Sequence, residues 1–272
     1  MILSQGANPV FLTKNYVNRD VILAGGVLTA TSMQALVERV VDMDPYATWN
    51  SGGSNDTVTE TIDIALYEGV TQVLRSDIAL IALLNINFKT FTIQLSDDNG
   101  SSFHTTYTVS NHAAAQYVLD LSAGVKSANF VRITATTTQT ANEEKVLGTV
   151  VVAGLVHQMV ADPVHPMSRT TSFNMKVLTM ADGSENISYI KRSAASFEFY
   201  AATFKFEYVT DAELLIFRAL RREYPTFLFY PEPYEKPGEI FLCRFNGTPK
   251  TQNSDYFKGA GYDLQFDVKE VG

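Results

Sequence analysis

The most informative segment of the chain for its fold is Asp42-Met43-Asp44-Pro45-Tyr46-Ala47-Thr48-Trp49-Asn50-Ser51. An acidic turn with a proline leads into Trp49, the only tryptophan of the chain, and a polar loop follows at 52–56. Residues 58–64 then alternate apolar and polar side chains, as a half-buried strand does. Tryptophan is a large apolar side chain with one N–H donor, so it anchors a core edge or a binding face. A turn, an anchor and a strand in this order favour a β-sandwich module over a catalytic domain.

The composition supports a mainly β protein that does not bind nucleic acid and does not insert into a membrane. The 272 residues are 46% hydrophobic and include 17 phenylalanines and 13 tyrosines, which suit half-buried pleated strands. The net charge of -8 argues against a nucleic-acid binder, which needs a basic face. The most apolar run, residues 78–84, is too short to cross a bilayer. The first eight residues lack a basic segment and a long apolar segment, so we expect synthesis in the cytoplasm without an export signal.

The chain divides into four segments. Residues 1–18 are polar and lack a period, which predicts an N-terminal arm that could pair with a neighbour. Roughly eight short strands separated by turns fill residues 19–160, the pattern of a sandwich or jelly roll. Two prolines at positions 163 and 166 predict a linker over 161–167. A second β domain occupies 168–272, again with alternating strands.

Three local patterns make specific structural predictions. The alternating segment 91–95 meets Asn99-Gly100, a dipeptide that predicts a hairpin because both residues tolerate positive φ. Thr210 and Glu213 form a capping box that predicts a helix over about 211–224. Cys243, the only cysteine, lies between apolar neighbours and predicts a buried thiol in a strand, with no disulfide.

The sequence contains no recognisable catalytic pattern. The four histidines show no metal-ligand spacing, and there is no nucleophile elbow or phosphate-binding glycine loop, so we expect a protein that is not an enzyme and needs no cofactor. Asp42 and Asp44 leave two interpretations open. Their carboxylates could coordinate Ca²⁺ at the lip of a sandwich, or each could bond local backbone N–H groups in a capped turn. The capped turn is the favoured interpretation.

The N-terminal part resembles the discoidin (coagulation factor 5/8 type C, galactose-binding-like) jelly roll over about residues 19–157. The resemblance implies that the matching segments build the scaffold and that variable loops bind ligands, so it transfers no specific binding residue. A Ca²⁺ site is not universal in that family. The segments that carry it are Leu28-Thr29-Ala30-Thr31-Ser32, Val41-Asp42-Met43-Asp44 with Thr48-Trp49, Thr61-Ile62-Asp63-Ile64, Asn85-Ile86-Asn87, residues 93–100 and Val131-Arg132-Ile133.

The C-terminal part, roughly residues 168–272, is similar to minor tail and tail-tip proteins of long-tailed bacteriophages. The resemblance rests on residues 204–213, the helix, and Pro225-Thr226-Phe227-Leu228-Phe229-Tyr230-Pro231-Glu232-Pro233. It implies a tail-tube-like β-sandwich with one helix that assembles into rings. The expected role is therefore structural, in a tail tip, distal tail ring or baseplate of a virion. The partners would be further copies of the chain and the tube, hub and tape-measure proteins.

An alternative function is a carbohydrate-binding adhesin module that attaches to a glycan on a host cell surface. Carbohydrate sites combine exposed aromatic rings with polar loop residues, and Tyr46 and Trp49 are the candidates here. Core packing is at least as good an interpretation of Trp49. A hydrolase is a third class, which the absence of catalytic patterns disfavours.

Overall fold

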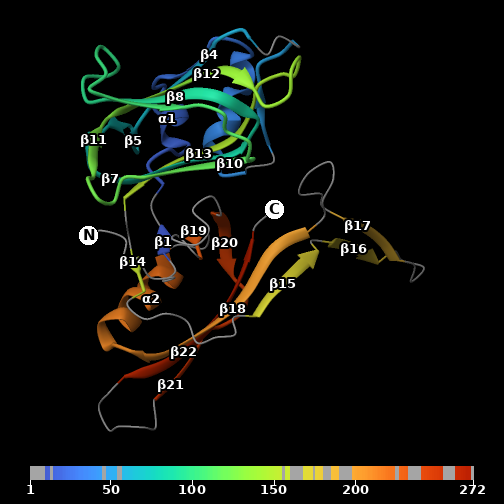
Figure 1. The fold of residues 1–272 in the computed structure, drawn as a ribbon. Coiled ribbons are helices and arrows are strands. Elements are labelled where there is room, and N and C mark those ends of the chain that lie inside the picture. Colours follow the sequence, from blue (N-terminus) through green and yellow to red (C-terminus); the bar gives the residue numbers. More distant parts are fainter. Residues whose placement is uncertain are drawn as a thin grey trace. The chain divides into compact units, whose positions relative to one another are not determined.

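The computed structural model describes residues 10–12, 15–44, 47–53, 57–154, 157–159, 168–173, 175–179, 185–189, 198–223, 227–231, 240–253 and 261–270. These residues form two compact units, both drawn in Figure 1. The first unit holds the described residues between 15 and 154. The second holds those from 157 to 270 together with strand β1 (Val10–Leu12).

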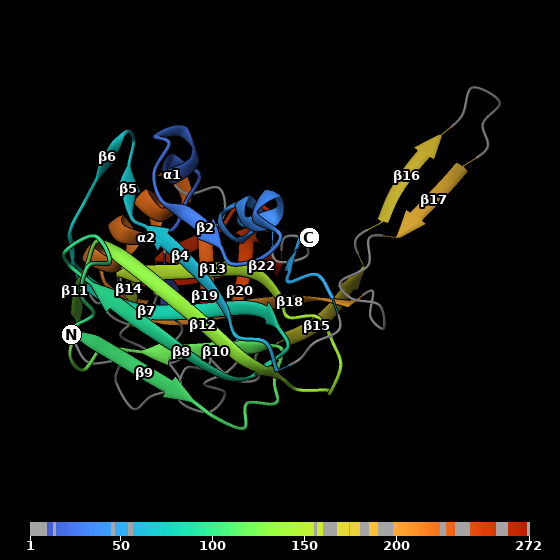
Figure 2. The same cartoon turned by 90° about the horizontal axis from the view of Figure 1, so that it is seen from above.

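The first unit contains two five-stranded antiparallel sheets. The apolar sheet has the order β10-β7-β13-β3, with β11 also paired to β7. The polar sheet has the order β2-β4-β12-β8-β9, and Figure 2 shows β4, β12, β8 and β9 following one another across it. The apolar sheet consists of β3 (Trp49–Asn50), β7 (Arg75–Ile86), β10 (Gln116–Asp120), β11 (Lys126–Ala128) and β13 (Val146–Gly154). The polar sheet consists of β2 (Leu28–Ala30), β4 (Glu60–Ala65), β8 (Phe88–Ser96), β9 (Thr105–Val109) and β12 (Phe130–Thr138).

Both sheets contribute to one hydrophobic core, but they differ in periodicity. In the polar sheet, buried and partly exposed residues alternate, as Ile62 and Ile64 do with Thr61 and Asp63. In the apolar sheet, β7 is buried without a break from Ile78 to Leu84. Alternation is typical of a strand with one covered face, and a continuous apolar run is typical of a strand with both faces covered.

Short elements complete the first unit. They are helix α1 (Asp20–Leu23), the 3-10 helix η1 (Gln34–Val41) and the hairpin of β5 (Tyr67–Glu68) and β6 (Thr71–Gln72). The hairpin is held to α1 by the backbone N–H of Gly69, which donates to Asp20 Oδ2 at 2.9 Å.

The second unit is built on one eight-stranded antiparallel sheet in its described part. Its order is β14-β1-β19-β20-β22-β18-β15, and β21 also pairs with β22. A separate hairpin joins β16 (Met175–Thr179) to β17 (Glu185–Tyr189). The sheet consists of β1, β14 (His157–Gln158), β15 (Ser168–Phe173), β18 (Glu198–Val209), β19 (Phe227–Tyr230), β20 (Phe241–Phe245), β21 (Lys250–Asn253) and β22 (Tyr262–Glu270).

Helix α2 (Asp211–Glu223) begins with the predicted capping box. The Thr210 backbone N–H donates to Glu213 Oε2 at 3.1 Å, and the Glu213 N–H donates to Thr210 Oγ1 at 3.3 Å. Each residue satisfies an N–H group that the first helical turn leaves unpaired. The buried face of α2, with Phe217 at its centre, packs into a core made largely of phenylalanine rings.

Strand β1 supplies part of that phenylalanine core. The Phe11 ring is fully buried and lies 5.1 Å from the Phe229 ring and 6.0 Å from the Phe217 ring, measured between centroids. Residues 10–12, within the segment expected to be an arm, thus form a strand of the eight-stranded sheet, between the edge strand β14 and β19. Residues 15–18 belong to the first unit, and residues 1–9 lie outside the described part.

The mainly β fold with a two-sheet sandwich in the N-terminal half is confirmed. So is the hairpin at Asn99-Gly100, because β8 and β9 pair around it, although the connection spans 97–104. Cys243 is fully buried in β20, as predicted, and burial raises the pKa of its thiol well above the ordinary value. The expected linker, 161–167, lies outside the described residues.

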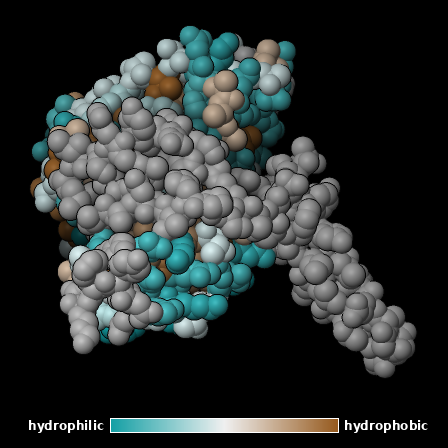
Figure 3. All heavy atoms as spheres, turned by 60° about the horizontal axis from the view of Figure 1, so that its bottom comes forward, coloured by the Kyte–Doolittle hydropathy of each residue, from teal (hydrophilic) through white to brown (hydrophobic). Residues whose placement is uncertain are grey.

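Large apolar side chains are exposed at scattered positions rather than in one broad surface. Leu23 and Val70 are the most exposed of them in the described residues, at 79% and 80%. On the face drawn in Figure 3, hydrophilic residues predominate among the coloured atoms. No helix in the described part of the chain is long and apolar enough to span a bilayer.

Candidate binding surface

Trp49 lies in the core of the sandwich. Its side chain is fully buried, and β3 pairs it with Leu147 of β13. The indole N–H donates to the backbone oxygen of Ser32 at 3.2 Å, which satisfies the only polar group of the ring. The buried ring therefore has no face to offer a sugar. Tyr46, the other aromatic candidate, lies outside the described residues.

Asp42 caps the turn that contains Asp44. Asp42 Oδ1 accepts a hydrogen bond of 2.9 Å from the Asp44 backbone N–H. Burial raises the pKa of Asp42 by disfavouring its charged form. Among the described residues, no group of three or more His, Cys, Asp and Glu side chains is placed to hold a metal ion.

The outward face of the polar sheet brings together polar side chains that are far apart in sequence. Strand register aligns five of them in one line across all five strands, which we name the arginine row. Arg132 of β12 lies at its centre, between Asp63 of β4 and Gln94 of β8. The full row is Thr29, Asp63, Arg132, Gln94 and Thr106.

Arg132 is held in one orientation by its neighbours. Its Nε and Nη2 donate to the two carboxylate oxygens of Asp63 at 2.7 and 2.8 Å. These hydrogen bonds raise the pKa of Arg132, so the guanidinium stays charged. The Phe103 ring stacks on it with 4.6 Å between Cζ and the ring centroid. The Arg132 side chain is still 33% exposed, and a guanidinium has five N–H donors. Donors therefore remain for a ligand.

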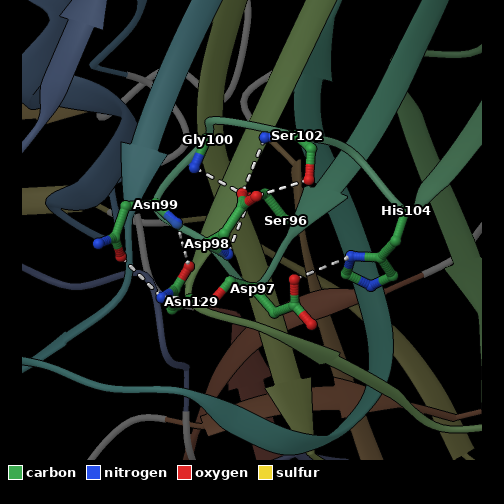
Figure 4. Close-up of polar contacts among 8 residues, drawn as sticks. All are labelled: Ser96, Asp97, Asp98, Asn99, Gly100, Ser102, His104 and Asn129. Carbon is green, nitrogen blue, oxygen red and sulfur yellow. Dashed lines mark hydrogen bonds and ion pairs between the residues drawn. The ribbon is translucent and has the colours of Figure 1, made fainter.

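The turn that carries Phe103 is stabilised by a dense polar network, drawn in Figure 4. Asp98 accepts hydrogen bonds from Ser96 Oγ at 2.6 Å and from the Ser102 N–H and Oγ at 2.8 and 2.5 Å. Asn129 ties the other side of the turn, because its Nδ2 donates to Asp97 O at 3.0 Å and to Asn99 Oδ1 at 2.7 Å. Phe103 thus extends from a turn that is fixed at both ends.

Two further features show how tightly this turn is defined. The hydrogen bonds from Ser102 and Ser96 lower the pKa of Asp98 to about 2, so its carboxylate is ionised over most of the pH range. Gly100 has a φ of +82°, and a Cβ there would lie 2.9 Å from the Phe130 ring. Only glycine fits that position. His104 lies at the edge, with Nδ1 3.8 Å from Asp97 Oδ1.

This surface combines chemical groups that can contact a ligand. A partly exposed aromatic ring, an oriented guanidinium and the Gln94 amide offer an apolar contact beside directional hydrogen bonds. Sequence reasoning placed Arg132, Asp63 and Gln94 on scaffold strands and did not assign them a ligand. The sequence does indicate that these three side chains point outward, because they lie in alternating segments. It does not indicate that they are neighbours, because the strands that carry them pair across long sequence separations.

Comparisons with known proteins gave structural matches only. No protein-family model matches the sequence, and no curated protein matches it either. Similar solved structures include a chitosan-binding module of a chitosanase/glucanase from Paenibacillus sp. IK-5 (21% identity, TM-score 0.41), which covers 52% of this chain and 99% of that chain. Another is a fucose-binding module of Streptococcus pneumoniae (15% identity, TM-score 0.37), with 52% and 96% covered.

A third similar structure is a module of Clostridium perfringens in complex with GalNAc-β-1,3-galactose (16% identity, TM-score 0.37), with 47% and 94% covered.

Proposed function

We propose that the first unit is a carbohydrate-binding module that attaches the chain to a neutral surface glycan. The ligand lies on the outward face of the polar sheet, at Arg132, Phe103 and Gln94. The observation that carries the proposal is the oriented Arg132 guanidinium, held by Asp63 on one side and stacked on Phe103. Sugars present hydroxyls at the ring edge and C–H groups on the ring face, and this surface offers a partner for each.

The charges favour a neutral ligand over an anionic one. The chain has a net charge of -8, and Asp63 neutralises the one cation of the arginine row. An anionic ligand would meet a repulsive field and a guanidinium that is already paired. A neutral polyhydroxyl ligand needs only donors, acceptors and an apolar face.

Preorganisation of the turn makes binding to this surface favourable. The network of Asp98 and Asn129 fixes the chain that carries Phe103 before any ligand arrives. Less conformational freedom is then lost on binding, so more of the contact energy remains as affinity.

A glycan array probed with the labelled full chain tests this proposal, followed by calorimetric titration of the best neutral glycan. We expect Phe103→Ala to weaken binding about tenfold, since it removes both the stacking surface and the support of Arg132. Leu74→Ala, at an exposed apolar residue outside the arginine row, is the matched control and should leave affinity unchanged. An array without a neutral glycan ligand, or full affinity in Phe103→Ala, would contradict the proposal.

A second candidate function, assembly with further copies of the chain, is favoured by the second unit. In the described residues the hairpin β16–β17 pairs only with itself. A lone two-stranded hairpin is marginally stable in water, and unpaired strand edges are templates for another chain. We therefore propose that this hairpin contacts a neighbouring copy. The tail-ring role, the tube, hub and tape-measure partners and the virion location stay predictions.

Native mass spectrometry of the full chain at rising concentration tests the assembly proposal. Deletion of residues 175–189 should shift any oligomer to monomer while circular dichroism keeps its β signal. An oligomer that survives the deletion would count against the hairpin, and so would a chain that stays monomeric at every concentration.

A further inference from the structure

The arginine row has a neighbour on the same face of the polar sheet. On β4, β12, β8 and β9, the residue two positions from the arginine row is a threonine, and the strand pairing places these four threonines in one line. We name this line the threonine row: Thr61, Thr134, Thr92 and Thr108. Thr108 is exposed and the other three are partly exposed. Adjacent strands lie about 4.8 Å apart, so the four side chains span about 14 Å.

The hydroxyls of the threonine row are available for a ligand. In the described part of the chain, none of these four hydroxyl groups forms a hydrogen bond to another side chain or to the backbone; Thr61 contacts Thr31 Oγ1 through its backbone N–H, which donates to that oxygen. Threonine is stiff at χ1, so little rotamer freedom is lost when its hydroxyl binds. The row therefore presents donors and acceptors at regular spacing in an ordered array.

The two rows run side by side, about 7 Å apart along the strands. That separation is close to the width of a pyranose ring. The spacing between strands is close to the length of one sugar residue in an extended glycan. A glycan chain that runs across the strands can thus lie flat, with one edge of its rings over the arginine row and the other over the threonine row.

We propose that this face binds an extended, unbranched, neutral β-linked polysaccharide along its chain, rather than a terminal monosaccharide. This inference rests on the proposed carbohydrate function and specifies the class of ligand. The sheet twists by about 20° from strand to strand, so a straight chain follows the rows only for a short distance. We infer that the face holds about three pyranose residues, the number that matches its span.

Calorimetric titration with β-1,4-linked glucose and N-acetylglucosamine oligomers of two to six residues tests the proposal. Affinity should rise with length up to about three residues and then level off. Thr134→Val and Thr92→Val replace a hydroxyl by a methyl group of the same size. Each should weaken binding of the six-residue oligomer about two- to tenfold, the range of one hydrogen bond. Thr71→Val, at an exposed threonine of β6, is the matched control and should change nothing.

The outcomes separate this inference from the proposed function. Equal affinity for the two- and six-residue oligomers, with wild-type affinity in both valine variants, would overturn the extended-chain inference. If Phe103→Ala still weakened binding in that case, the module would bind carbohydrate as a short ligand. Absence of binding to every oligomer by the wild-type chain, together with an empty glycan array, would overturn both.

Discussion

The two sheets of the first unit share one core but differ on their outward faces. In the apolar sheet, β7 is buried from Ile78 to Leu84 and β13 from Leu147 to Gly154. In the polar sheet, outward positions carry threonines, Arg132 and Gln94, and these remain partly exposed. A strand with an unbroken apolar run is buried on both faces, whereas a strand with alternating residues has one buried face and one face exposed to solvent. The difference leaves side chains on the outward face of the polar sheet accessible to solvent, and this is the face proposed to bind a ligand.

The largest expected effect concerns the core that both sheets share. Trp49→Ala should lower the free energy of unfolding of the first unit by about 3–5 kcal/mol, because it removes a fully buried ring and leaves a cavity. Urea unfolding followed by circular dichroism measures the change. Trp49→Phe is the milder control and should cost less. A loss below about 1 kcal/mol for the alanine variant would show that the ring is not a core residue.

A pair of isosteric exchanges tests the outward faces directly. Val151 of the apolar sheet is fully buried, so Val151→Thr takes a hydroxyl out of water and should cost about 1–3 kcal/mol of unfolding free energy. The reverse exchange on the polar sheet, Thr134→Val, should stay within about 0.5 kcal/mol of wild type. Similar losses of unfolding free energy in both variants would mean that the outward faces of the two sheets do not differ in burial.

Sequence predicted the elements better than their lateral order. Alternation in 91–95 predicted β8, and the capping box at Thr210 predicted α2, because both signals are local. The alignment of Arg132 with Asp63 and Gln94 depends on register between strands 38 and 69 residues apart, which no local pattern fixes. Strand β1 joins the second unit across more than 200 residues for the same reason.

Choosing candidates by residue type leads to Trp49 and not to the residues of the proposed surface. Trp49 was selected because it is the only tryptophan and has an amphipathic ring. That ring is satisfied within the core, where its N–H finds Ser32. Phe103, a plain apolar residue in a loop, lies instead on the exposed guanidinium of Arg132. Outward positions on alternating strands were the better guide, since alternation itself marks the exposed face.

A smaller effect is expected from pH at the turn that supports Phe103. The pKa of Asp98 lies at about 2 in the folded chain, against an ordinary value of 3.8. Between these values the unfolded chain binds the proton and the folded chain does not. The stabilisation is therefore full above the ordinary value and is lost as pH falls through about 2.

Thermal unfolding measured from pH 5 to pH 2 checks this sign. The melting temperature of the wild type should fall more steeply with acid than that of Asp98→Asn, which cannot titrate at this position. Parallel curves for the two proteins would show that the hydrogen bonds from Ser102 and Ser96 do not depress the pKa of Asp98.

We propose that the polar sheet, and not the loop around Trp49, binds the ligand. Amide chemical-shift mapping of the isotopically labelled full chain tests it, with the best neutral glycan from the array as titrant. We expect the largest shifts on β12, β8 and the turn at 97–104, around Arg132, Gln94 and Phe103. Shifts concentrated at residues 42–59, with β12 and β8 unaffected, would contradict it.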